Sequence, residues 1–191
     1  MPLSLSAEDL IKVVRNYYDS TNNFHFTLET SPEASRRQAL WTQWIAHMDP
    51  WLAFRDELGS KLPDYVIGET YSSHDGGPRC IIYPPDDLRT PFSDWTVVGC
   101  LSLLAPVCFV YGLERDRRIK ARRYKVSFEP PPPHMSLPAQ IIARTIETSF
   151  RVSAVPRAVA DTPVHLFVGN LEPPKTTLFH ALFTDEPETI P

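Results

Sequence analysis

Apolar residues in the amino-terminal third of the chain recur every three or four positions, which is the spacing of helices. The first series follows Ser6, and Asp9 completes the form of a helix N-terminal box. The second series follows Ser31 and Pro32, a capping residue and a proline at the first helical position. Its apolar stripe consists of five residues: Leu40, Trp41, Trp44, Ile45 and Met48. We therefore expect two helical regions here.

Three features interrupt this helical part. Pro50 is expected to kink or break the second helical region, because a proline inside a helix clashes with the preceding turn. Gly59 is the expected carboxyl-terminal stop of that region. Between the two helical regions, apolar and polar residues alternate over 24–28, which favours a short half-buried strand.

From Tyr65 onward the texture changes to short β-rich runs. Residues 65–67 and 80–83 are rich in Val, Ile and Tyr, and residues 72–78 between them have the Ser, Asp, Gly and Pro composition of a turn. This pattern predicts a β-hairpin.

Residues 95–113 contain no charged side chain over nineteen positions. By length alone this run could cross a bilayer as a helix, and the arginines that follow suit a cytoplasmic flank. The β-branched valines and a break at 103–106 instead divide the run into two strand-length pieces. We favour two buried strands and keep a transmembrane span at 95–113 as the alternative.

The carboxyl-terminal part mixes both patterns. Residues 124–128 alternate as a strand with one charged face, and the proline run that ends at Pro133 is either a rigid spacer or a docking site for an aromatic groove. Pro138 is expected to open a helix. We further expect a strand over 164–168 and a short apolar helix over 178–183.

The predicted fold class is α+β, with a mostly antiparallel sheet of about five to six strands packed by three to four helices. A chain of 191 residues is long enough for one compact core, so we expect a single α+β domain over 1–191. Its helical part is 1–62, its β-rich part is 63–129, and a helix–strand–helix part spans 134–185.

Composition and charge narrow the class of protein and its expected partners. The chain has 42% hydrophobic and 22% charged residues, which is ordinary for a globular protein. A net charge of -4 gives no global attraction for nucleic acid or anionic membranes. Three cysteines in apolar runs and an amino terminus without a secretory pattern favour a reducing, cytoplasmic setting.

The common catalytic motifs for phosphate, dinucleotide, zinc and acyl chemistry are absent from the sequence. One set of side chains could bind a divalent cation or share acid–base work: Asp64, Glu69, His74 and Asp75. The same stretch is also what a turn needs without any function. Cys100 or Cys108 could form a nucleophile with a histidine, but apolar surroundings favour a core role. We predict no catalytic residue, no cofactor and no metal site.

The segment 115–125 is the clearest local anomaly, with seven of the nineteen basic residues within eleven positions. Arginine offers a planar fork for anions, so the segment could contact phosphates or an acidic patch on a protein. It could equally be a solvated strand edge that charge protects from aggregation.

Three carboxyl-terminal stretches, 159–163, 168–171 and 177–185, resemble the endings of small bacterial proteins related to toxin-immunity families. The resemblance covers roughly the last thirty residues and carries no catalytic signature. It implies a small cytoplasmic inhibitor that plugs or covers a cognate effector protein. It assigns a role to no individual residue.

The sequence therefore predicts an immunity-type protein that neutralises a cognate bacterial toxin by stoichiometric association. Charged residues are expected to form the rim of its binding surface: Asp75, Asp86, Asp87, Arg117, Arg118, Arg122 and Arg123. A small metal-dependent hydrolase, a nucleic-acid-binding protein that uses the segment 115–125, and a subunit of a larger assembly are the alternatives. The oligomeric state stays open.

Overall fold

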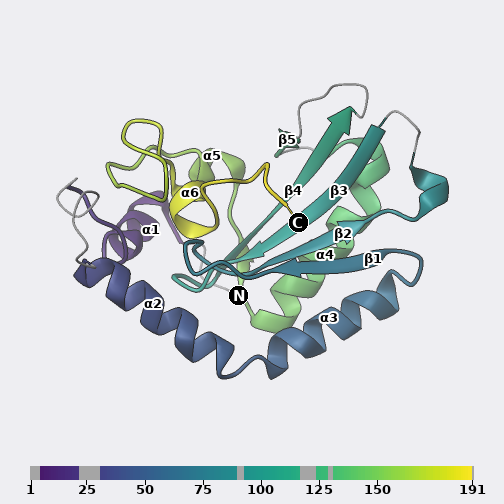
Figure 1. Cartoon of the computed structure of the whole chain (residues 1–191), viewed down its shortest axis with the longest axis horizontal. Coiled ribbons are helices and arrows are strands. Elements are labelled where there is room, and N and C mark those ends of the chain that lie inside the picture. Colours follow the sequence, from purple (N-terminus) through teal and green to yellow (C-terminus); the bar gives the residue numbers. More distant parts are fainter. Residues whose placement is uncertain (1–4, 22–30, 90–92, 117–123, 129–130, 191) are drawn as a thin grey trace.

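A computed structural model describes residues 5–21, 31–89, 93–116, 124–128 and 131–190. Its centre is a six-stranded sheet with five antiparallel strands in the order β1-β2-β3-β4-β5, and a sixth, β6, parallel to β4 (Figure 1). The strands are β1 (Val66–Thr70), β2 (Arg79–Tyr83), β3 (Ser93–Leu101), β4 (Val107–Asp116), β5 (Lys125–Ser127) and β6 (Ser153–Ala154). The predicted α+β class with a mostly antiparallel sheet is confirmed, and so is the β1–β2 hairpin.

The uncharged run 95–113 forms the centre of this sheet. It supplies most of β3 and β4, which pair from Leu101 with Cys108 to Ser93 with Asp116. Successive side chains of a strand point to opposite faces, and both faces are buried here, so neither face tolerates charge. The prediction of two buried strands is confirmed, and the transmembrane alternative is wrong. None of the helices in the described ranges has the length and apolarity that a membrane crossing requires.

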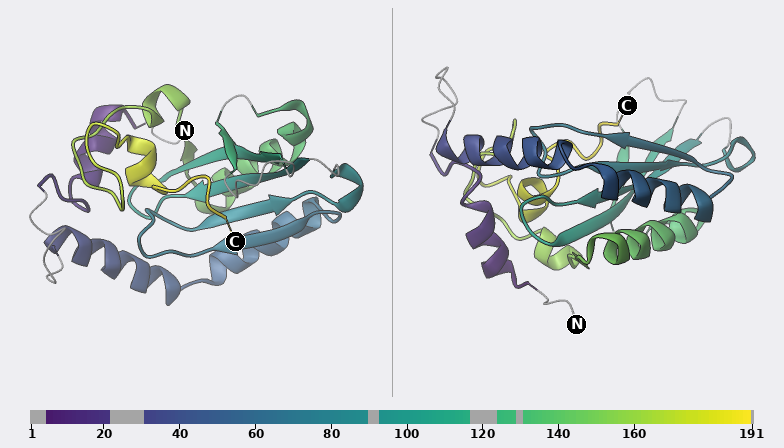
Figure 2. Two further views of the ribbon diagram at one scale, coloured as in Figure 1. Left: turned by 45° about the horizontal axis from the view of Figure 1, so that its top comes forward. Right: turned by 90° about the horizontal axis from the view of Figure 1, so that it is seen from below.

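Helices α3 (Asp49–Lys61) and α4 (Ser136–Phe150) cover one face of the sheet (Figure 2). Gly99 allows this close packing, because a Cβ atom there would lie 2.5 Å from Cδ1 of Ile142. The core on this side combines helix side chains with one alternating set from the strands, including Ile82 and Val97.

The face of the sheet opposite α3 and α4 is covered by helices that lie at one end of the sheet. Helices α1 (Ala7–Val14), α5 (Arg157–Ala160) and α6 (Leu178–Leu182) gather beside the β1–β2 and β3–β4 loops (Figure 1). Their side chains join the second alternating set of strand residues, such as Ile81 and Val98, in a second core. Helix α2 (Pro32–Ile45) and the short 3-10 helices η1 (Asp86–Leu88) and η2 (Pro133–Met135) complete the elements in the described part of the chain.

Local signals near the amino terminus act as expected. The Ser6 side chain accepts a hydrogen bond from the Asp9 backbone, and the Asp9 carboxylate accepts one in return, which is a capping box. Ser31 caps α2 through the backbone amide of Ala34. The break expected at Pro50 is found just before it, since α2 ends at Ile45 and α3 begins at Asp49.

Several sequence predictions about boundaries and exposure are wrong. Gly59 does not end α3, which continues to Lys61, and α4 begins at Ser136, two residues before Pro138. Ile45 does not join the buried stripe, because 55% of its surface is exposed. The strand expected over 24–28 lies outside the described residues.

Residues 164–168 do not form the predicted strand, although their apolar side chains alternate. Val164, Leu166 and Val168 are buried, but none of the strands in the described residues runs alongside them. Their backbone amides instead bond to scattered carbonyls: Val164 to Thr176, Phe167 to Asp19 and Val168 to Leu171. The alternation of apolar residues therefore reflects burial of one side of this segment. The β-bridges near it, in the described residues, are isolated ones.

Candidate functional site

A polar pocket of 520 Å³ lies between the β1–β2 loop and the carboxyl-terminal segment. Its ionisable lining residues are His74, Asp75 and Arg79 from the loop and β2, and Asp185 and Glu186 that follow α6. We call this the polar pocket. It brings together residues that lie about a hundred positions apart in the sequence.

Residues 75–78 of the β1–β2 loop are buried against other parts of the backbone. The Gly76 amide donates to the Phe183 carbonyl (2.8 Å), and its carbonyl accepts from the Leu103 amide (2.9 Å). A Cβ atom on Gly77 would lie 1.8 Å from the carbonyl oxygen of Leu101, so only glycine fits between these backbones. Asp75 is 4% exposed, so it cannot contribute to the exposed rim that the sequence predicted.

Asp75 forms a buried ion pair with Arg79. Oδ2 of Asp75 lies 3.4 Å from Nε of Arg79, and both side chains are less than one-tenth exposed. Nη1 of Arg79 also donates to the Thr189 carbonyl (3.0 Å). Burial raises the pKa of Asp75 to about 6, although Arg79 and a hydrogen bond from Thr184 oppose that shift. The nearby carboxylate of Asp185 raises it further.

The structure does not assemble the predicted metal or acid–base set. Glu69 accepts hydrogen bonds from Nε1 of Trp51 (2.9 Å) and Nη1 of Arg55 (3.1 Å). Asp64 lies in the turn before β1, and Glu69 lies near the other end of that strand. Within the described residues, no three His, Cys, Asp or Glu side chains form a group that could hold a metal ion.

The cysteines have the core role that the sequence favoured. Cys80, Cys100 and Cys108 are free and buried. Burial raises the pKa of Cys80 and of Cys108 to about 12 each, and it also raises the pKa of Cys100. A neutral thiol is a poor nucleophile, so the cysteine–histidine arrangement has no chemical support here.

The other predicted rim residues divide between described and undescribed parts. Asp86 and Asp87 lie exposed on η1, where Asp86 faces Arg89 with Oδ1 3.5 Å from Nη1. Arg117, Arg118, Arg122 and Arg123 lie outside the described residues. Of the basic segment, Arg115 is already paired, since its Nη2 lies 3.5 Å from Oδ2 of Asp94.

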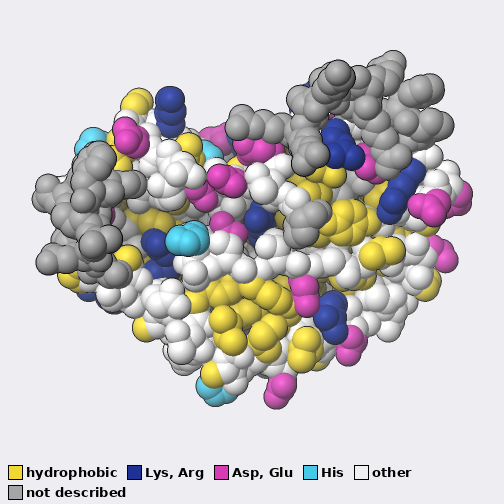
Figure 3. Space-filling view, in the orientation of Figure 1, with side chains coloured by type: hydrophobic (Ala, Val, Ile, Leu, Met, Phe, Trp, Pro, Cys, Tyr) yellow, Lys and Arg dark blue, Asp and Glu magenta, His cyan; other side chains and the backbone are white. Residues whose placement is uncertain are grey.

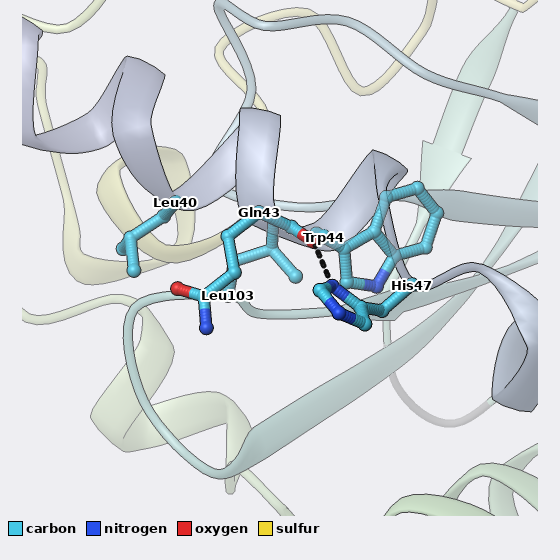
Figure 4. Close-up of a pocket in the computed structure, with 5 residues that line it drawn as sticks. All are labelled: Leu40, Gln43, Trp44, His47 and Leu103. Atoms are coloured by element: carbon cyan, nitrogen blue, oxygen red, sulfur yellow. Dashed lines mark hydrogen bonds between the residues drawn. The ribbon is translucent and has the colours of Figure 1, made fainter.

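A second hollow, which we call the aromatic hollow, lies where the β3–β4 loop meets α2. It has a volume of 340 Å³ and is lined by Leu40, Gln43, Trp44, His47 and Leu103 (Figure 4). Hydrophobic side chains gather on this face of the molecule between the sheet and helices α2 and α3 (Figure 3). Tyr71, whose ring contacts that of Trp44, is 38% exposed.

Trp44 is held by a cluster of other aromatic rings. Its ring centroid lies 5.5 Å from that of Trp41, 5.7 Å from that of Trp51 and 5.5 Å from that of Tyr71. Trp41 and Trp51 are fully buried and hydrogen-bonded through their indole nitrogens to Asp75 and Glu69. The indole of Trp44 therefore lines the hollow on a rigid base.

Sequence reasoning missed both hollows. Trp44 was assigned to a helical stripe and Leu103 to the break between two strands, and nothing in their spacing places them together. Arg79 was also missed. An arginine directly before the apolar run 80–83 is expected to be buried with that run, and a buried charge needs a partner of opposite charge. Asp185 and Glu186 carry no local motif.

Comparisons with protein-family models, with curated proteins and with solved structures found no match. The geometry of the two hollows therefore carries the functional argument.

Proposed function

We propose that this chain is an immunity-type protein that neutralises a cognate bacterial toxin by stoichiometric protein–protein association. The aromatic hollow is the observation that carries the proposal. Energetic hot spots of protein interfaces are enriched in Trp and Tyr, seated in well-packed apolar surroundings. Trp44, with Tyr71 beside it, has this character.

Rigidity supports binding at this place. Association costs less conformational entropy when the side chains that make the contact are already ordered. Trp44 packs edge-on against two buried tryptophans, so little order has to be gained on association.

The hollow is poorly equipped for catalysis. His47 is the one ionisable side chain among its lining residues, and its Nδ1 lies 2.9 Å from the Gln43 carbonyl of its own helix (Figure 4). General acid–base chemistry needs a positioned group within reach of a second polar or reacting group. Recognition of an apolar group on a partner suits this surface better than a reaction does.

Charged residues would steer association in this proposal. Asp86 and Asp87 on η1, or the basic residues Arg117, Arg118, Arg122 and Arg123, are the two sets that the sequence offers for this role. Reversing the charge of each set in turn tests this part. Loss of association rate at low salt for either set supports steering, and unchanged kinetics for both sets contradicts it.

The main experiment begins with capture of proteins from the native cell lysate on the tagged chain. The retained protein is then purified, and its affinity and stoichiometry are measured by calorimetry. We expect one-to-one binding, and co-expression should relieve the growth defect that the partner causes alone. Trp44→Ala should weaken binding at least tenfold.

Leu137→Ala is the matched control, because Leu137 is an apolar side chain on α4 with 62% exposure, away from the hollow. It should leave the affinity unchanged. Failure to retain any protein that binds in purified form contradicts the proposal, and so does equal binding by wild type and the Trp44 variant.

A further inference from the structure

We propose that the polar pocket binds an organic cation that carries a guanidinium or ammonium group. This site is separate from the aromatic hollow and does not depend on the proposed function. The pocket measures 520 Å³, within the range of pockets that hold small ligands or single side chains.

The lining carries more acid than base. Three carboxylates, those of Asp75, Asp185 and Glu186, face one guanidinium, that of Arg79. Arg79 is committed to Asp75 and to the carbonyls of Glu186 and Thr189. Within the ranges that the structure describes, Asp185 and Glu186 form no ion pair with Lys or Arg. The pocket therefore offers negative charge that an incoming cation could neutralise.

The two outer carboxylates are held in place before any ligand arrives. Oδ2 of Asp185 accepts a hydrogen bond from the Asn170 amide (3.0 Å), and Oε1 of Glu186 accepts one from Nδ2 of Asn170 (3.4 Å). Gly169 makes this approach possible, since its φ is 53° and a Cβ atom there would lie 1.9 Å from Oδ2 of Asp185. One oxygen of each carboxylate remains for a ligand.

The floor of the pocket supplies an independent observation. Oδ2 of Asp75 is buried and makes no hydrogen bond within the described part of the chain, although Nε of Arg79 lies 3.4 Å away. The Asp75 side chain lines the pocket and is more than nine-tenths buried. Buried polar atoms in folded proteins are nearly always hydrogen-bonded, so this carboxylate oxygen in the pocket wall can accept a hydrogen bond from an N–H donor of a ligand.

A multidentate organic cation fits this lining better than a metal ion. The acidic side chains do not converge on one point, because no described group of three or more could hold a metal. A guanidinium presents five N–H donors in one plane, and an ammonium presents three, so either can reach separated oxygens. An anionic ligand would meet three carboxylates and is disfavoured.

The ligand chemistry has two sources, a free molecule or a basic side chain of another protein. Agmatine is the free probe, since it carries a guanidinium and an ammonium, and a blocked Gly-Arg-Gly peptide represents the side chain. Binding is followed by amide chemical shifts of the whole chain and by calorimetry at low salt. We expect saturable shifts confined to the residues around Asp75, Asn170 and Asp185.

Removing the two outer charges should weaken binding at least tenfold in the double variant Asp185→Asn, Glu186→Gln. The control Glu8→Gln, Asp87→Asn removes the same charge from exposed positions outside the pocket and should bind as wild type. Stronger binding of agmatine assigns the site to a free molecule, and stronger binding of the peptide assigns it to a partner side chain.

The inference is overturned if neither probe shifts the pocket resonances at millimolar concentration. It is also overturned if both double variants lose affinity equally, because attraction would then follow net charge alone. The wild-type shifts test the site even if the pocket variant folds poorly.

Discussion

Asp75 and Arg79 form an ion pair in the interior, with Oδ2 and Nε 3.4 Å apart and both side chains less than one-tenth exposed. The pair joins three segments. Asp75 belongs to the β1–β2 loop, Arg79 begins β2, and Nη1 of Arg79 holds the carboxyl-terminal segment through the Thr189 carbonyl. The hydroxyl of Tyr111 on β4 also holds the carboxyl-terminal segment, because it donates a hydrogen bond to the Pro187 carbonyl (3.0 Å).

This pair predicts a pH-dependent stability. The pKa of Asp75 is raised by burial from 3.8 to about 6 in the folded chain. Its contribution to the free energy of unfolding is therefore fully present below pH 3.8 and is lost as the pH rises through 6. Relative to Asp75→Asn, wild type should lose about 1–3 kcal/mol between pH 4 and 7. Urea unfolding of both proteins across this range measures it, and a constant difference would contradict the assignment.

Breaking the pair from the other side should be costly. Arg79→Met leaves a buried carboxylate without its partner and removes the donor to the carboxyl-terminal carbonyls. The free energy of unfolding should therefore fall by about 3–5 kcal/mol. Hydrogen exchange should also accelerate over 183–190. Arg55→Met is the control, because Arg55 forms a more exposed pair with Glu69, and we expect it to cost about 1 kcal/mol or less. Equal losses in both variants would disprove the special role of the buried pair.

Two glycines should respond oppositely to alanine. At Gly99 a Cβ atom would meet Ile142 at 2.5 Å and Ile146 at 2.8 Å, so Gly99→Ala should destabilise by about 1–3 kcal/mol. At Gly59, inside α3, a Cβ atom meets nothing within 4 Å, so Gly59→Ala should stabilise by about 0.5–1 kcal/mol. Thermal unfolding of the two variants beside wild type decides both signs.

The cysteines should be chemically silent in the folded protein. All three are buried, and burial raises their pKa values, so almost no thiolate exists at pH 8. A thiol reagent such as dithionitrobenzoate should react with none of them in buffer and with all three in denaturant. Stoichiometric reaction in buffer, faster than global unfolding, would show that one of them is accessible.

Much of the fold could be predicted because its signals are local. Ser6 and Ser31 begin helices by capping their first amides, and Pro50 sits just after a helix break, so neighbouring residues decide these boundaries. The lack of charge in 95–113, its β-branched valines and the break at 103–106 predicted two strands, and each of these strands is buried on both faces. The strand predicted over 164–168 does not form, because a strand also needs a neighbour and a local pattern carries no information about one.

The sequence by itself determined the starts of the first two helices, the β1–β2 hairpin, the two strands of 95–113 and the burial of the cysteines, since these features depend on residues a few positions apart. Tertiary structure alone decided that Asp75 is buried, that Arg79 reaches the carboxyl-terminal segment, and that Trp44 meets Leu103. These relationships join residues that are tens of positions apart, and long-range contacts follow from how sheet and helices pack. Both candidate sites belong to this second class, because each is lined by segments that only the packed fold brings together.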